Sequence, residues 1–147
     1  MTRFKNMRKP SLAALAKAVV RRDEEAVMEL LRRGVDINEK DDMGWTVLRQ
    51  ASIRGYTNMV RLLLDNGAEV DLKGRGGATA LMDASWRGHA ETASLLIERG
   101  ADVNALNDFG SPALKHAVHD GQAEVVSLLI DHGAEVELPG AEESLLG

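Results

Sequence analysis

The sequence repeats itself every 33 residues, and this period limits the chain to a stacked architecture. Each unit carries an aliphatic pair, a polar spacer, a glycine and a short extended stretch, namely LLRRGVDIN at 30–38, LLDNGAEVD at 63–71, LIERGADVN at 96–104 and LIDHGAEVE at 129–137. Two further sets of glycines keep the same spacing, the first being Gly44, Gly77 and Gly110 and the second Gly55, Gly88 and Gly121. A unit this small becomes stable only by stacking on its neighbours.

Each unit is predicted to hold two short helices. The aliphatic residues of the second helix recur at a spacing that places them on one face. They are Val27, Leu30 and Leu31, then Val60, Leu63 and Leu64, then Ala93, Leu96 and Ile97, and finally Val126, Leu129 and Ile130. Gly67 and Gly100 are expected to end these helices with a positive φ, since glycine takes the left-handed conformation at little cost.

A first helix precedes each of these, over about 46–54 in the second unit, with Leu48 and Ala51 facing inward. Residues suited to starting the first helices are Thr46 and Thr79 as N-caps and Pro112 in a first turn. Helices of about nine residues do not persist alone in water, so stacking must stabilise them. Only five aromatic residues are present, which also favours an all-α fold over a sheet.

Three segments, GWTVLRQAS at 44–52, GATALMDAS at 77–85 and GSPALKHAV at 110–118, resemble the G-x-T-P-L-H-x-A-A motif of the ankyrin repeat family. The stretch GHAETASLLIERGADVNA at 88–105 resembles the second half of that repeat. The resemblance implies a solenoid of four stacked helix-turn-helix units with β-turn finger loops. Arg49, Met82 and Lys115 replace the family's histidine, so its Thr–His hydrogen bonds are expected to be missing.

The resemblance covers about 11–138 and divides the chain into parts. A basic N-terminal tail, 1–10, precedes a single domain, and 139–147 form a C-terminal tail or partial cap. The units of that domain are predicted at 11–40, 41–73, 74–106 and 107–138. The first unit has Arg22 where the glycine that ends a first helix is expected, and is interpreted as an N-terminal cap with a solvated outer helix.

The charge pattern argues against nucleic acid and membrane partners for the body of the chain. There are 18 basic and 23 acidic residues, giving a net charge of −5, and no cysteine. No apolar stretch approaches the roughly 20 residues needed to span a bilayer. A cytoplasmic monomer is expected. Residues 1–22 nevertheless hold seven basic residues and no acidic one, which leaves a targeting segment or an anionic-surface contact open.

No motif in the sequence predicts catalysis. His116 and His119 have a spacing that suits two metal ligands, yet no third ligand lies near. The glycines of 74–77 lack the strand and Lys-Ser/Thr of a phosphate loop, and Asp41 and Asp42 lie in an exposed turn. We therefore predict no catalytic residue, no cofactor, no metal and no enzyme activity.

Positions that vary between units are the candidates for recognition. The resemblance implies that partners meet the finger loops and the exposed side of the first helices, which form a concave face. The corresponding residues are Lys40, Asp42, Met43, Trp45, Ile53 and Arg54 in the second unit, Lys73, Arg75, Ala78, Trp86 and Arg87 in the third, and Leu106, Asp108, Phe109, Ser111, His119 and Asp120 in the fourth.

The aromatic members of this set form the sharpest functional hypothesis. Trp45, Trp86 and Phe109, flanked by Arg54 and Arg87, are predicted to form an aromatic and cationic strip, because Trp and Arg dominate binding hot spots. The alternative is that each tryptophan only covers its own repeat.

The function predicted from these residues is a non-enzymatic scaffold that binds a partner protein. One alternative is a regulatory or inhibitory subunit of an enzyme, which a single stoichiometric enzyme partner would identify. The other is binding of an anionic surface or nucleic acid through residues 3–22, which a steep salt dependence would identify.

Overall fold

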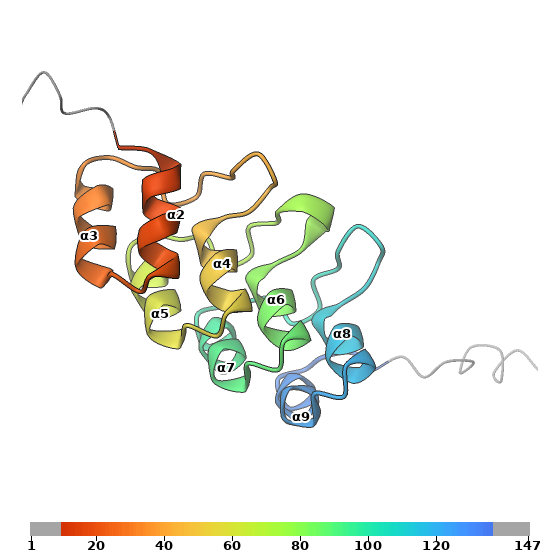
Figure 1. The fold of residues 1–147 in the computed structure, drawn as a ribbon. Coiled ribbons are helices and arrows are strands. Elements are labelled where there is room, and N and C mark those ends of the chain that lie inside the picture. The colour runs from red at the N-terminus through yellow and green to blue at the C-terminus, as the bar shows by residue number, and fades with distance from the viewer. Residues whose placement is uncertain (1–9, 137–147) are drawn as a thin grey trace, which may run out of the picture.

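The computed structural model describes residues 10–136, and within them the chain forms eight α-helices in two rows (Figure 1). The first row contains α2 (Leu12–Val20), α4 (Val47–Ile53), α6 (Ala80–Trp86) and α8 (Ala113–His119). The second row contains α3 (Glu24–Arg32), α5 (Thr57–Asp65), α7 (Ala90–Glu98) and α9 (Ala123–Asp131). This part of the chain has no β-strand and one 3-10 turn, η1 (Arg75–Gly77), so the predicted all-α solenoid is confirmed.

The rows arise because each first helix is followed, after a short turn, by a second helix that packs against it. The contacting pairs are α2 with α3, α4 with α5, α6 with α7 and α8 with α9. Successive pairs then stack along both rows, α4 on α6 and α5 on α7, for example. Finger loops project beyond the first row between successive pairs, as Figure 1 shows.

One hydrophobic core runs through all the pairs. Leu48, predicted to face inward, belongs to a first-row column with Leu15, Leu81 and Leu114, and each of the four is less than a tenth exposed. Leu63, Leu96 and Leu129 form the matching column of the second row and are fully buried. Since burial of a leucine side chain contributes about 1.5–3 kcal/mol, these regular columns hold helices that would not form alone.

The predicted helix ends are largely confirmed. Gly67 and Gly100 have φ of +96° and +95°. Thr46 and Thr79 are N-caps whose hydroxyl oxygens accept backbone N–H groups of α4 and α6. Pro112 differs slightly from the expectation, since it is the N-cap residue of α8 and precedes the first turn.

Arg22 keeps the left-handed conformation of the glycine that it replaces, with a φ of +58°. Its guanidinium carbon lies 3.8 Å from the centroid of the Tyr56 ring in the next repeat. The cation–π contact offsets part of the backbone strain of a non-glycine residue in this conformation. The residue is thus a link between the first two repeats, which its alignment with glycine did not predict.

The last pair departs from the expected burial. Ile130, predicted to face inward, is 46% exposed, and Val118 on α8 is 59% exposed. The reason is positional, because no fifth helix pair covers α8 and α9 within the described residues. The basic segment up to residue 9 and the predicted tail 139–147 lie outside the described part of the chain. No helix between residues 10 and 136 is long and apolar enough to cross a membrane.

Candidate functional site

The structure places most of the predicted recognition residues at the surface. Met43 is 58%, Trp86 44% and Phe109 88% exposed. Trp45, Ile53 and Ala78 are half-buried. Ser111 is a correction, because it is buried at 8% exposure and its side chain is not available to a partner. The remaining members are exposed or half-buried, namely Lys40, Asp42, Arg54, Lys73, Arg75, Arg87, Leu106, Asp108, His119 and Asp120.

In two finger loops a side-chain oxygen accepts hydrogen bonds from backbone N–H groups of the same turn. Asp41 Oδ1 accepts hydrogen bonds from the backbone N–H groups of Met43 and Trp45, at 2.9 and 2.8 Å. Asn107 Oδ1 accepts in the same way from Phe109 and from the residue that follows Gly110. Because short polar side chains readily cap their own turns, Asp41 is a structural residue, and the finger is held with an apolar side chain at its tip.

A buried ion pair joins the second repeat to the third. Arg49 on α4 donates from Nε to Asp83 Oδ2 at 2.7 Å and from Nη2 to Asp83 Oδ1 at 3.1 Å. Both residues are only 5% exposed. The Arg49 guanidinium carbon also lies 4.2 Å from the centroid of the Trp45 ring. One buried cation therefore connects two neighbouring first helices and supports an aromatic residue of the candidate face.

This pair shows what replaces the missing histidine in the second repeat. The sequence identified Arg49 only as a departure from the family motif. In the structure Arg49 makes a bidentate contact, the strongest type of charge-assisted hydrogen bonding. The sequence signal that could have predicted the pair is the opposite charge of Asp83, which lies one repeat and one residue after Arg49. That spacing places the two side chains on adjacent first helices.

The carboxyl group of Asp83 is electrostatically perturbed. Burial raises its pKa above the ordinary range, while the hydrogen bonds and positive charge of Arg49 act in the opposite direction. Desolvation disfavours the charged form of a carboxylic acid, and a nearby cation favours it. The ionised state of Asp83 thus depends on Arg49.

Gly74 makes room for this arrangement. It stands where the second and fourth units have Asp41 and Asn107. A Cβ atom at this position would collide with the Arg49 guanidinium and with the carbonyl oxygen of Gly44. Glycine is therefore required at position 74 in the third finger. The turn η1 that follows Gly74 has no side-chain cap.

A groove of about 770 Å³ lies on the first-row side of the molecule and is called the first-helix groove. Its lining residues come from α4, the preceding finger and the turn after α6, and they are Trp45, Gln50, Ile53, Arg54, Arg87 and His89. Four of them belong to the predicted recognition set. Trp86 and Phe109 do not line it, so the predicted strip is not one continuous cavity.

The charged and polar side chains of the first-helix groove are held in place. Arg54 Nη1 donates to the carbonyl oxygen of Gln50 at 2.9 Å, and His89 Nε2 donates to that of Ile53 at 3.0 Å. The guanidinium carbon of Arg87 lies 4.5 Å from the centroid of the Trp86 ring. The groove is therefore positively charged and partly apolar, with no carboxylate in its lining.

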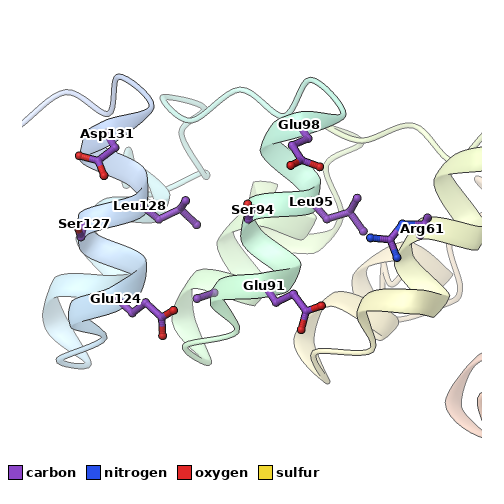
Figure 2. A pocket seen from close by; sticks show the side chains of 10 residues that line it. Arg61, Glu91, Ser94, Leu95, Glu98, Glu124, Ser127, Leu128 and Asp131 are labelled. Carbon is purple, nitrogen blue, oxygen red and sulfur yellow. The ribbon is translucent and has the colours of Figure 1, made fainter.

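The opposite row presents a groove of the other charge, shown in Figure 2 and called the second-helix groove. It lies across α5, α7 and α9 and measures about 650 Å³. Leu95 and Leu128 form apolar parts of its lining. Its charged side chains are the carboxylates of Glu91, Glu98, Glu124 and Asp131 and the guanidinium of Arg61.

The histidine pair of α8 makes separate contacts. His116 Nε2 accepts a hydrogen bond from Asn107 at 3.3 Å, and His119 lies 3.4 Å from Asp120. Burial lowers the pKa of His116, which favours the neutral ring in this role. Across residues 10–136, no three His, Cys, Asp or Glu side chains gather in a way that could hold a metal ion.

Comparison with known families agrees with this architecture. A model of ankyrin repeats in three copies matches residues 12–107, and a second model of ankyrin repeats matches residues 88–130. The chain belongs to the ankyrin repeat family. No curated protein matches it. Ankyrin repeats are in general non-enzymatic modules of protein–protein interaction.

Proposed function

We propose that this protein binds a partner protein through the first-helix groove and the adjacent finger loops. The observation that carries the proposal is the first-helix groove itself, where Trp45 and Ile53 lie beside Arg54 and Arg87. Aromatic and arginine side chains in one well-formed site are the usual composition of a binding hot spot. The nearby exposed residues Trp86 and Phe109 extend the available apolar surface.

The rigid fingers support the same proposal. Asp41 and Asn107 fix the backbone of the turns that carry Met43 and Phe109, so the loop backbone does not have to be ordered on binding. Pre-organisation lowers the entropy cost of association. A partly apolar surface on fixed loops therefore favours specific recognition over chance exposure of single residues.

The test is affinity capture from the native lysate with quantitative mass spectrometry, using the intact chain and its variants. Trp86→Ala is the cleaner change, because Trp86 is 44% exposed and is not part of the buried core, and its effect on stability is expected at about 1 kcal/mol. Binding of the captured partner is expected to weaken by at least about 2 kcal/mol. Trp45→Ala is expected to weaken it equally, but with some loss of stability, since Trp45 is half-buried against Arg49.

Glu91→Ala and Glu124→Ala are the matched controls, since both residues line the second-helix groove in Figure 2. They are expected to leave capture of the partner nearly unchanged. If the folded tryptophan variants retain the partner as well as the wild type does, the two residues only cover their own repeats. The first-helix face would then not be the binding surface.

A further inference from the structure

The first-helix groove and the second-helix groove differ in charge, and the difference points to a class of partner. The second-helix groove has four carboxylates and one arginine among its charged residues, whereas the first-helix groove has two arginines and a histidine and no carboxylate. The chain as a whole is acidic, with a net charge of −5. A local positive groove in an acidic protein is therefore not a consequence of composition.

Within residues 10–136, Arg54 and Arg87 have no charged partners of their own. Neither forms an ion pair with a carboxylate of the described residues, unlike Arg49, which pairs with Asp83, and Arg99, which pairs with Asp65. Arg54 is held by a carbonyl oxygen of its own helix, and Arg87 is stacked on Trp86. Each guanidinium keeps free N–H donors, so it can accept a carboxylate without breaking an existing pair.

The surface around these cations is partly apolar. Trp45 and Ile53 are half-buried and line the same groove, and His89 is fixed by its bond to the backbone of α4. A carboxylate bound at the rim by arginine would thus lie next to an apolar floor. This combination suits an Asp or Glu side chain followed closely by an aliphatic or aromatic one.

From these observations we infer that the first-helix groove binds an acidic segment of the partner protein, in which Asp or Glu residues alternate with apolar ones. The inference rests on the proposed function and adds the chemistry of the partner. Charge complementarity of this kind raises the rate of association and rejects basic competitors. The carboxylates on the opposite row reinforce the selection, because they repel an acidic segment from that face.

The same observations disfavour nucleic acid as the occupant. Binding of a phosphate backbone depends on many Lys and Arg residues that follow its path and release counterions. The first-helix groove offers two arginines, and the acidic second row would repel the continuing strand. Two fixed guanidinium groups beside an apolar floor suit one or two carboxylates better than a phosphate chain.

The experiment is selection of a random-peptide display library on the intact protein at neutral pH, followed by affinity measurement on synthetic copies of the enriched peptides. We expect enriched peptides to carry more Asp and Glu than the input library. Arg54→Glu/Arg87→Glu is expected to weaken their binding at least about tenfold, because it replaces both attractive contacts with repulsion. Selection on that double variant is expected to favour Lys and Arg instead.

Arg32→Glu/Arg61→Glu is the matched control. It changes the net charge equally, but on exposed residues of α3 and α5 in the second row. It is expected to change peptide affinity by no more than about twofold, since long-range effects are screened by salt. An equal loss in this control would overturn the inference, because it would show a non-specific effect of net charge.

Three further outcomes separate the inference from the proposed function. If enriched peptides are neutral or basic and lose affinity in Trp86→Ala but not in the arginine double variant, the acidic partner is refuted and the proposed function stands. If no peptide is enriched, or none depends on Trp86, Arg54 or Arg87, both are refuted. If a thymidine oligonucleotide displaces the acidic peptides at matched concentration, the groove recognises nucleic acid and the inference is overturned.

Discussion

The buried pair of Arg49 and Asp83 provides the strongest test of how neighbouring repeats are held together. In Arg49→Met the flexible apolar side chain keeps much of the arginine's packing but removes its charge and its two hydrogen bonds to Asp83. The Asp83 carboxylate, 5% exposed, is then left without a cation. Breaking a buried pair in this way costs about 3–5 kcal/mol.

The Coulomb attraction within the pair gives a similar energy. With a contact of 2.7 Å the charge centres lie about 4 Å apart, and their attraction is about 4 kcal/mol at an effective dielectric of about 20. Asp83 can escape this loss only by taking up a proton. At neutral pH that uptake costs about 4 kcal/mol for a carboxyl group with an unfolded pKa of about 3.9, which sets an upper limit to the electrostatic loss.

The loss of stability in Arg49→Met depends on pH, because proton binding by Asp83 is linked to folding. Burial already raises the pKa of Asp83 in the folded protein, and loss of Arg49 removes the groups that lower it. A raised folded pKa means that the folded state holds the proton more tightly than the unfolded state. The deficit of the variant relative to the wild type therefore grows as pH rises between the folded pKa of Asp83 in the wild type and its still higher folded pKa in the variant. It shrinks on acidification to about 2 kcal/mol or less near pH 5.

The assay is urea unfolding at neutral pH and near pH 5, followed by both tryptophan fluorescence and far-ultraviolet circular dichroism. Arg54→Met is the matched control, because Arg54 is exposed just after α4 and its replacement should cost no more than about 0.5 kcal/mol. Arg49→Met/Asp83→Leu removes both charges and is expected within about 1 kcal/mol of wild type. A loss below about 1 kcal/mol in Arg49→Met at neutral pH, or an equal loss at both pH values, would refute the reasoning.

Three backbone predictions accompany it, all measurable as changes in the free energy of unfolding. Gly100→Val is expected to cost about 1–3 kcal/mol from strain alone, since φ is +95° and no atom lies within 4 Å of the added Cβ; unchanged melting would contradict the helix-end assignment. Gly55→Ala is expected to cost more than Gly100→Ala, because its Cβ would lie 2.5 Å from the His89 ring of the next repeat, and equal losses would contradict this. Arg22→Gly is expected to raise the stability of a Tyr56→Ala variant by about 1 kcal/mol, because glycine adopts the positive φ without strain. The same substitution is expected to raise the stability of the wild type less, because there it also removes the cation–π interaction with Tyr56. Equal gains in both backgrounds would show that this interaction contributes nothing.

The fold was predictable because periodicity reports burial directly. Leu48 and Ala51 were assigned inward from spacing alone, and both are buried. The positive φ of Gly67 and Gly100 followed from their place after an aliphatic pair. Such features depend on local conformation and on the stacking of similar units. The residues of each repeat determine both the conformation and the stacking.

The candidate site was less predictable because it depends on differences between repeats. Variability selected Arg87 correctly as a surface position, but it also selected Ser111, which the capped finger turn buries. Nothing in a single repeat indicates that Arg49 reaches Asp83, because the contact crosses a repeat boundary. The requirement for Gly74 is hidden for the same reason, since the side chain that excludes a Cβ there belongs to the preceding unit.

The buried pair also gives Trp45 two roles at once. Its ring lies against the Arg49 guanidinium on one side and lines the first-helix groove, so the same contact that joins the second and third repeats also orients a residue of the candidate face. A histidine that only bonds within its own repeat would not create this connection. Arg49 thus joins two repeats through Asp83 and lies against the aromatic ring of Trp45, while the exposed cations Arg54 and Arg87 supply the charge of the first-helix groove.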